Sequence, residues 1–139
     1  MSTDKSAQMN TDKTRDGYLY EKLTYQIISC LYAVQNSLGS NHKESAYHKA
    51  LEFEFQDREI PFTTETSLPV IYKDKRVGSY RPDFIVDDTV ILEIKVAPHI
   101  TKAMQSQVYY YVKGTRFKLV LLANFGTPKV TIKRLIYTI

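Results

Sequence analysis

Apolar residues recur every three or four positions in the stretch from residue 20 to residue 38. They are Tyr20, Leu23, Ile27, Leu31, Val34 and Leu38. This spacing predicts an amphipathic helix that ends at Gly39, with Asp16 and Gly17 as a candidate start. Cys30, the one cysteine of the chain, falls inside this apolar stretch. We therefore expect a buried, inert thiol in a reducing compartment.

A second helix is predicted from about residue 42 to the residue before Pro61. Tyr47, Leu51 and Phe55 recur at steps of four, which places them on one inward face. Glu44 lies one turn before Tyr47 on nearly the same face, so we expect an acidic side chain at the start of the inward stripe. The hydroxyl of Tyr47 is expected to hold either Glu44 or backbone.

Runs rich in β-forming residues predict strands in the next part of the chain. We expect a strand at residues 62–72, a turn at 73–75 and a return strand at 76–80. Pro69 indicates an edge strand or a bulge. The segment RPDFIVDDTVILEIK, residues 81–95, predicts two strands joined by a tight turn at residues 87–89.

A third helix is predicted in the segment TKAMQSQVYYYVKGT, where Gly114 closes it. Its apolar positions are Ala103, Met104, Val108, Tyr111 and Val112, and Tyr111 is expected in the core. A continuous apolar strand at residues 117–125 and a final alternating strand follow. A strand, a crossover helix and a further strand predict a right-handed βαβ unit. The order of elements therefore predicts an α/β fold, a three-layer α/β/α sandwich with a mixed central sheet.

Length and composition fit one globular domain, since the chain has 139 residues and 43% hydrophobic content. We place this domain at residues 18–139, after a flexible tail at residues 1–17 that has no apolar period. No stretch approaches the roughly 20 apolar residues of a membrane span, and the tail lacks the apolar core of a signal peptide. We expect a soluble, cytoplasmic protein with no membrane partner.

Charge is distributed unevenly along the chain. Residues 1–93 carry 11 Lys and Arg against 15 Asp and Glu, whereas residues 94–139 carry eight Lys and Arg and no acid. This asymmetry indicates either a polyanionic partner or a solvated lysine face.

Two acids and a lysine interrupt the strand pair at residues 81–95. A turn at residues 87–89 places Asp83 across from Glu93, within one residue of register, and Lys95 shares a face with Glu93. Two carboxylates about 5 Å apart repel by roughly 3 kcal/mol at an effective dielectric constant of 20, and Lys95 offsets only part of this. A divalent cation would resolve the repulsion, because Mg²⁺ takes carboxylate oxygens and water and keeps positions open for a phosphate.

These residues also resemble a known signature. Pro82-Asp83, nine further residues and then Glu93-Ile94-Lys95 resemble the motif of the PD-(D/E)XK nuclease superfamily. The segment LGSNHKESAYHKALE, residues 38–52, resembles the LGxGxxExxYxxAL signature of the GxxExxY family, a small bacterial branch of that superfamily. Asn41 stands in place of the first motif glycine, and Asn tolerates a left-handed backbone. The resemblance implies a restriction-endonuclease-like core and a metal-dependent nuclease, with DNA favoured over RNA.

By this resemblance, Asp83 and Glu93 would hold Mg²⁺ or Mn²⁺, and Glu44 would complete the metal shell directly or through water. Lys95 would orient the attacking water and stabilise charge on the phosphorane. Gln107 corresponds to a glutamine often found near such sites, where it would hold the lysine, the water or the phosphate.

The basic C-terminal part would bind the nucleic-acid backbone with little base specificity. The candidate contacts are Arg81, Lys102, Lys113 and Arg116. Cleavage of two strands would favour a homodimer.

The residues alone leave other interpretations open. Glu44 could be a first-turn acid favoured by the helix dipole, and Lys95 a salt-bridge partner of Asp83 or Glu93. Arg81 could form a salt bridge at the rim instead of a phosphate contact. The histidines show no ligand spacing, so we expect surface or capping roles, not metal binding. They are His42, His48 and His99.

Two further hypotheses concern function. One is a nucleic-acid- or protein-binding module that keeps the fold without catalysis, and the other is a structural salt-bridge cluster in a protein of different function. The four charged motif positions are all present, and a pure binder has no need of paired acids. This favours the nuclease over the binding module.

Overall fold

The structure is a computed structural model, and it describes residues 20–137. The tail predicted at residues 1–17 and the candidate helix start within it lie outside the described residues. All three predicted helices are confirmed: α1 (Glu21–Leu38), α2 (Glu44–Asp57) and α3 (Lys102–Val112). Gly39 follows α1 with a φ of 76° and Gly114 follows α3 with a φ of 88°, a left-handed backbone that glycine adopts without steric cost.

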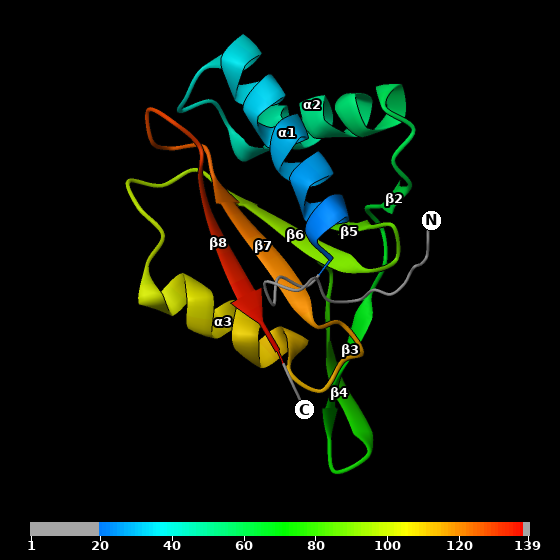
Figure 1. The fold of residues 1–139 in the computed structure, drawn as a ribbon. Helices are drawn as coiled ribbons and strands as arrows, with labels where there is room; N and C mark the ends of the chain where they lie inside the picture. Colours follow the sequence, from blue (N-terminus) through cyan, green and yellow to red (C-terminus); the bar gives the residue numbers. More distant parts are fainter. Residues whose placement is uncertain (1–19, 138–139) are drawn as a thin grey trace.

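Five strands form one mixed sheet. In spatial order they are β2 (Phe62–Thr63), β5 (Phe84–Val86), β6 (Val90–Lys95), β7 (Leu119–Asn124) and β8 (Thr131–Ile136). Among the described strands, only β6 and β7 run parallel, because α3 crosses over between them. Figure 1 shows α1 and α2 on one face of this sheet and α3 on the other. The predicted three-layer α/β/α sandwich is confirmed.

One strand prediction was wrong. The segment at residues 62–72 is two strands, since β2 joins the central sheet whereas β3 (Leu68–Tyr72) pairs with β4 (Lys75–Tyr80) in a separate ribbon. Pro69 has no amide hydrogen to donate, so this stretch suits a ribbon with free edges better than the interior of a sheet. The predicted irregularity is present as a register shift between Val70 and Ile71.

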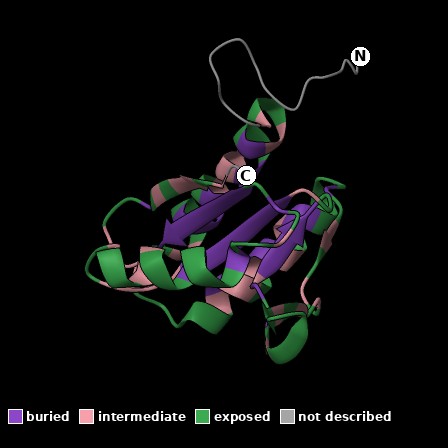
Figure 2. Cartoon of the chain, turned by 90° about the horizontal axis from the view of Figure 1, so that it is seen from below, coloured by how far each residue is buried: buried purple, intermediate pink, exposed green. Residues whose placement is uncertain are grey.

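Apolar side chains fill both spaces between the sheet and its helices. Leu92 and Ile94 belong to the cluster beneath α1 and α2, whereas Ile91 packs with Val108 and Val112 of α3. Every residue of β7 is buried, as predicted for a strand covered on both faces. Figure 2 shows buried central strands and helices whose outer faces are exposed.

One residue of α3 differs from expectation. Tyr111, expected in the core, keeps 37% of its surface exposed. The buried residues of this outer helix are Val108 and Val112, so it turns only a narrow stripe towards the sheet. The ring of Tyr111 instead stacks on Tyr80 with centroids 4.8 Å apart.

Other predictions about the first two helices are confirmed. Cys30 is fully buried, and burial raises the pKa of its thiol to about 11. The Tyr47 hydroxyl donates to the Gly39 carbonyl at 2.5 Å, so it holds backbone and not Glu44. Asn41 has a φ of 70°, the left-handed backbone expected there. None of the helices within residues 20–137 has the length and apolar character needed to cross a membrane.

Candidate active site

The hairpin of β5 and β6 sets the geometry of the acidic pair. Asp87 and Asp88 have φ values of 51° and 54°, which form the tight turn predicted there. The strands pair Phe84 with Leu92, so the preceding Asp83 lies across from Glu93. The predicted register is confirmed.

The carboxyl groups of Asp83 and Glu93 each accept a hydrogen bond from a backbone amide of the opposite segment. The backbone amide of Asp83 donates to Glu93 Oε1 at 3.3 Å, and the amide of Ile94 donates to Asp83 Oδ2 at 2.7 Å. Tyr80, the last residue of β4, donates its hydroxyl to Glu93 Oε2. These bonds fix both carboxyl groups at the end of the hairpin away from its turn.

The environment of Glu93 favours its neutral form. Only 8% of the residue is exposed, and burial, followed by the charge of Asp83, raises the pKa of Glu93 to about 7. Burial and the charge of Glu93 also raise the pKa of Tyr80, which keeps this hydroxyl a donor. Near neutral pH Glu93 is therefore partly protonated, and a cation would compete with its proton.

Lys95 lies two residues beyond Glu93 and shares its face of β6. It is half-buried, and within residues 20–137 it makes no ion pair with Asp83 or Glu93. The salt bridge considered from the sequence is therefore absent here. Its backbone is fixed, because its carbonyl accepts from the Phe125 amide at 2.9 Å.

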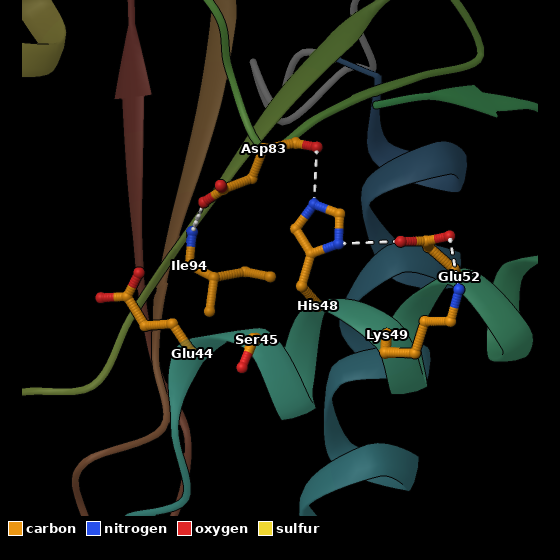
Figure 3. A pocket seen from close by; sticks show the side chains of 7 residues that line it. All are labelled: Glu44, Ser45, His48, Lys49, Glu52, Asp83 and Ile94. Atoms are coloured by element: carbon orange, nitrogen blue, oxygen red, sulfur yellow. Dashed lines mark hydrogen bonds and ion pairs between the residues drawn. The ribbon is translucent and has the colours of Figure 1, made fainter. Parts of the chain in front are cut away.

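A pocket of about 310 Å³ opens between the start of α2 and the Asp83 strand. Its lining residues, drawn in Figure 3, are Glu44, Ser45, His48, Lys49, Glu52, Asp83 and Ile94. Glu44 is the first residue of α2 and is exposed, as a first-turn acid would be. No group of three or more His, Cys, Asp or Glu side chains within residues 20–137 is placed to hold a metal ion. Glu44 thus shares a pocket with Asp83 without joining a three-residue cluster.

His48 is a residue of this pocket whose contacts differ from the surface or capping role predicted for it. Its Nε2 lies 3.1 Å from the Asp83 carbonyl oxygen and its Nδ1 lies 3.0 Å from Glu52 Oε2 (Figure 3). Its ring stacks on Phe84 with centroids 4.3 Å apart. His48 therefore ties α2 to the residue before β5 and positions Asp83. The prediction holds for His42, whose Nε2 lies 2.7 Å from the Leu38 carbonyl oxygen at the end of α1.

Two other polar residues of the site were missed. Tyr80 looked like an ordinary strand residue, and Asn124 like the end of an apolar run. The Asn124 side chain accepts from the amides of Ala97 and Gly126 at 2.9 and 3.0 Å and donates to the Ala97 carbonyl at 2.9 Å. Asn124 pairs with Lys95 across the parallel strands, so it fixes the chain just beyond the lysine. A buried amide that ends an apolar strand was the available signal.

Gln107 is exposed on α3 and makes no hydrogen bond with the acidic pair or with Lys95 among the described residues. It lies one turn before Tyr111, whose ring stacks on Tyr80. Gln107 therefore lies on the helix that contacts the site residue Tyr80.

The four basic candidates are all exposed, in different settings. Arg81 forms a salt bridge with Glu65 at 3.5 Å, which is the alternative to a phosphate contact that the sequence left open. Arg116 pairs with Asp88 of the hairpin turn at 2.5 Å. Lys113 lies over the ring of Tyr109, 5.8 Å from its centroid, and Lys102 begins α3.

Comparison with known protein families gives a match over most of the chain. A family described as the PD-(D/E)XK nuclease superfamily matches residues 21–135, which include the acidic pair, Lys95 and all of α2. The comparison with curated proteins gives no match, and neither does the comparison with solved structures.

Proposed function

The chain belongs to the PD-(D/E)XK nuclease superfamily, and we propose that it is a metal-dependent nuclease that hydrolyses DNA. Its sandwich is consistent with the restriction-endonuclease-like core of that superfamily. The observation that carries the proposal is the Asp83–Glu93 pair, in which a buried Glu93 carboxyl has its pKa raised towards neutrality beside a second acid. Lys95 lies on the same face with no ion-pair partner among the described residues.

The acidic pair fits a hard divalent cation. Mg²⁺ is usually held by one or two carboxylates, and its remaining positions go to water and phosphate. Carboxylate oxygens accept more than one bond each, so the bonds from Tyr80 and Ile94 leave lone pairs on both groups. We assign Asp83 and Glu93 as ligands of Mg²⁺ or Mn²⁺, and Glu44 as a group that acts through water from the pocket wall. Bound there, the cation would polarise a phosphoryl oxygen and make water a better nucleophile.

The surrounding residues have supporting roles in this proposal. Lys95 orients the water and stabilises negative charge that develops on the phosphoryl group. Tyr80 and His48 position the two acids through their hydrogen bonds. On the flanks, exposed polar residues contact the nucleic-acid backbone. They are Gln107, Arg81, Lys102, Lys113 and Arg116.

Cleavage assays test this proposal. Purified protein would be incubated with single- and double-stranded DNA and RNA in Mg²⁺, Mn²⁺ or EDTA, together with the variants Asp83→Asn and Asp88→Asn. Asp88 is an exposed acid of the hairpin turn, so Asp88→Asn is a matched control. We expect metal-dependent cutting of DNA that Asp83→Asn abolishes and Asp88→Asn retains. If the wild-type protein cuts none of the four substrates in a metal-dependent way, the proposal is contradicted.

A second candidate is a catalytically silent binding module on the same fold. The position of Glu44 favours it, because the third acid does not join the other two in one cluster. This candidate predicts that the wild-type protein binds nucleic acid in Mg²⁺ without cutting it, and that Asp83→Asn binds equally well.

A further inference from the structure

The ribbon of β3 and β4 extends away from the sandwich beyond the end of the sheet (Figure 1). Its base is anchored, since Leu68 and Val70 pack against the cluster beneath α3. Its outer half, residues 71–77, is exposed throughout and includes Ile71, Tyr72 and Val77 with exposed fractions of 55%, 58% and 63%. Large apolar side chains gathered on an exposed projection are typical of an interaction site.

The same outer half is basic. Lys73, Lys75 and Arg76 stand against one acid, Asp74. The ammonium of Lys73 lies 5.3 Å from the centroid of the Tyr72 ring, so charge and aromatic surface are adjacent. Interleaved basic and aromatic residues match a polyanion that also offers apolar surface, as nucleic acid does.

The ribbon is joined directly to the acidic pair. Strand β4 ends at Tyr80, whose hydroxyl bonds Glu93, and Asp83 follows three residues later. At about 3.3 Å per residue, the six residues of β4 span about 20 Å, so the turn at the tip lies roughly that far from the two carboxyl groups. A nucleic acid bound at Asp83 and Glu93 could therefore also contact the β3–β4 ribbon.

We propose that the β3–β4 ribbon enters the major groove of double-stranded DNA while the acidic pair faces its backbone, an inference that rests on the proposed nuclease function. The major groove of B-form DNA is about 12 Å wide and admits a two-stranded ribbon. The major groove of A-form RNA is deep and narrow, and a single strand has no groove. The ribbon thus selects duplex DNA as the substrate class, with Lys75 and Arg76 at phosphates and Tyr72 against base edges or sugars.

The test measures binding separately from cleavage. Fluorescent duplex DNA, duplex RNA of the same sequence and single-stranded DNA would be titrated in EDTA at several salt concentrations. The proteins are wild type, the ribbon variant Lys75→Ser/Arg76→Ser, and the control Lys22→Ser/Lys129→Ser, which removes two exposed lysines elsewhere. All substituted residues are exposed, and thermal unfolding would verify that each variant is folded.

We expect wild type and control to prefer duplex DNA, and the ribbon variant to bind it at least tenfold more weakly. The slope of log affinity against log salt should fall by about 2 in the ribbon variant, since each phosphate contact contributes about 0.9. Tyr72→Ala should weaken duplex binding without changing this slope. Equal affinity and slope in ribbon variant and control, or equal binding of duplex RNA and DNA by wild type, would overturn the inference.

The same proteins distinguish this inference from the proposed function. If cleavage requires Asp83 but is unchanged in the ribbon variant, the proposed nuclease function is supported and the proposed role of the ribbon is rejected. If duplex DNA binding requires the ribbon but no cleavage occurs under any condition, the role of the ribbon is supported and the nuclease function is rejected. Sedimentation adds a third outcome: a wild-type dimer that becomes monomeric in the ribbon variant, with unchanged DNA binding, would assign the ribbon to a second copy of this chain and overturn the inference.

Discussion

Strands β6 and β7 are parallel neighbours of equal length at the centre of the sheet, covered by the same helices, yet they differ in chemistry. β7 is apolar until its last residue, Asn124. β6 carries Glu93 and Lys95 at the positions that face Leu122 and Asn124 in the register. Because the two strands have the same position in the sheet and the same covering helices, their environment alone does not explain why only β6 carries charged residues.

The polar groups of the two strands differ in how they are satisfied. Asn124 makes three hydrogen bonds within the fold, to Ala97 and Gly126. At Gly126 a Cβ would lie 2.2 Å from the Ala97 carbonyl oxygen, so this corner requires glycine. Glu93, in contrast, is buried beside a second acid, and Lys95 has no ion-pair partner among the described residues. Asn124 thus serves the fold, whereas the proposed function assigns the charges of β6 to an external ligand.

Leu121→Ala in β7 should have the largest effect on stability. Leu121 is fully buried in the cluster beneath α1 and α2, and truncating such a leucine lowers the free energy of unfolding by about 3–5 kcal/mol. Denaturant unfolding would measure this. Ile136→Ala on the exposed side of β8 is the control and should cost far less. A loss below about 1 kcal/mol at Leu121 would show that β7 is not the stabilising strand.

Lys95→Met in β6 should show the opposite pattern. We expect DNA cleavage to fall about 100- to 1,000-fold, the cost of removing one preorganised positive donor, with little change in unfolding free energy. Lys133→Met removes an exposed lysine of β8 and should retain activity. Equal activity of the two variants would remove Lys95 from the proposed chemistry.

The pH dependence of stability should report the buried acid. The pKa of Glu93, ordinarily 4.5, is raised to about 7 by burial and by Asp83, so its stabilising contribution is fully present below about pH 4.5 and lost as pH rises through 7. Unfolding free energy should fall by about 3 kcal/mol across this window. Glu93→Gln should lack this decline, and Mg²⁺ should offset it in wild type. The same slope in both proteins would contradict the assignment.

His48→Ala should have the smallest effect of the set. It removes contacts to Asp83 and Glu52 from a partly exposed ring, so we expect about 1 kcal/mol of lost stability. If His48 positions Asp83, cleavage should also fall about tenfold, as at outer-shell residues of metal sites. His48→Gln keeps a donor and should recover part of the activity. Equal cleavage by His48→Ala and wild type would leave the histidine a purely structural role.

The sequence was sufficient to predict the layers of the fold, because helical spacing and continuous apolar runs report burial directly. It also predicted that Asp83 and Glu93 face each other, since a short turn fixes hairpin register. It could not predict that residues 62–72 divide between a sheet and a ribbon, since both halves have the same strand character. The roles of His48 and Tyr80 depend on contacts between segments 35 and 13 residues apart, and no local pattern encodes those contacts.

The central claim is that the charges of β6 form a divalent-cation site, and a calorimetric titration tests it without knowledge of the substrate. Mg²⁺ and Mn²⁺ would be titrated into wild type and Glu93→Gln at pH 7 in buffers of different ionisation enthalpy. We predict that wild type binds the ion and releases protons, because Glu93 is partly protonated at that pH, and that Glu93→Gln loses this binding. Equal ion affinity in the two proteins, or no binding by wild type, would contradict the claim.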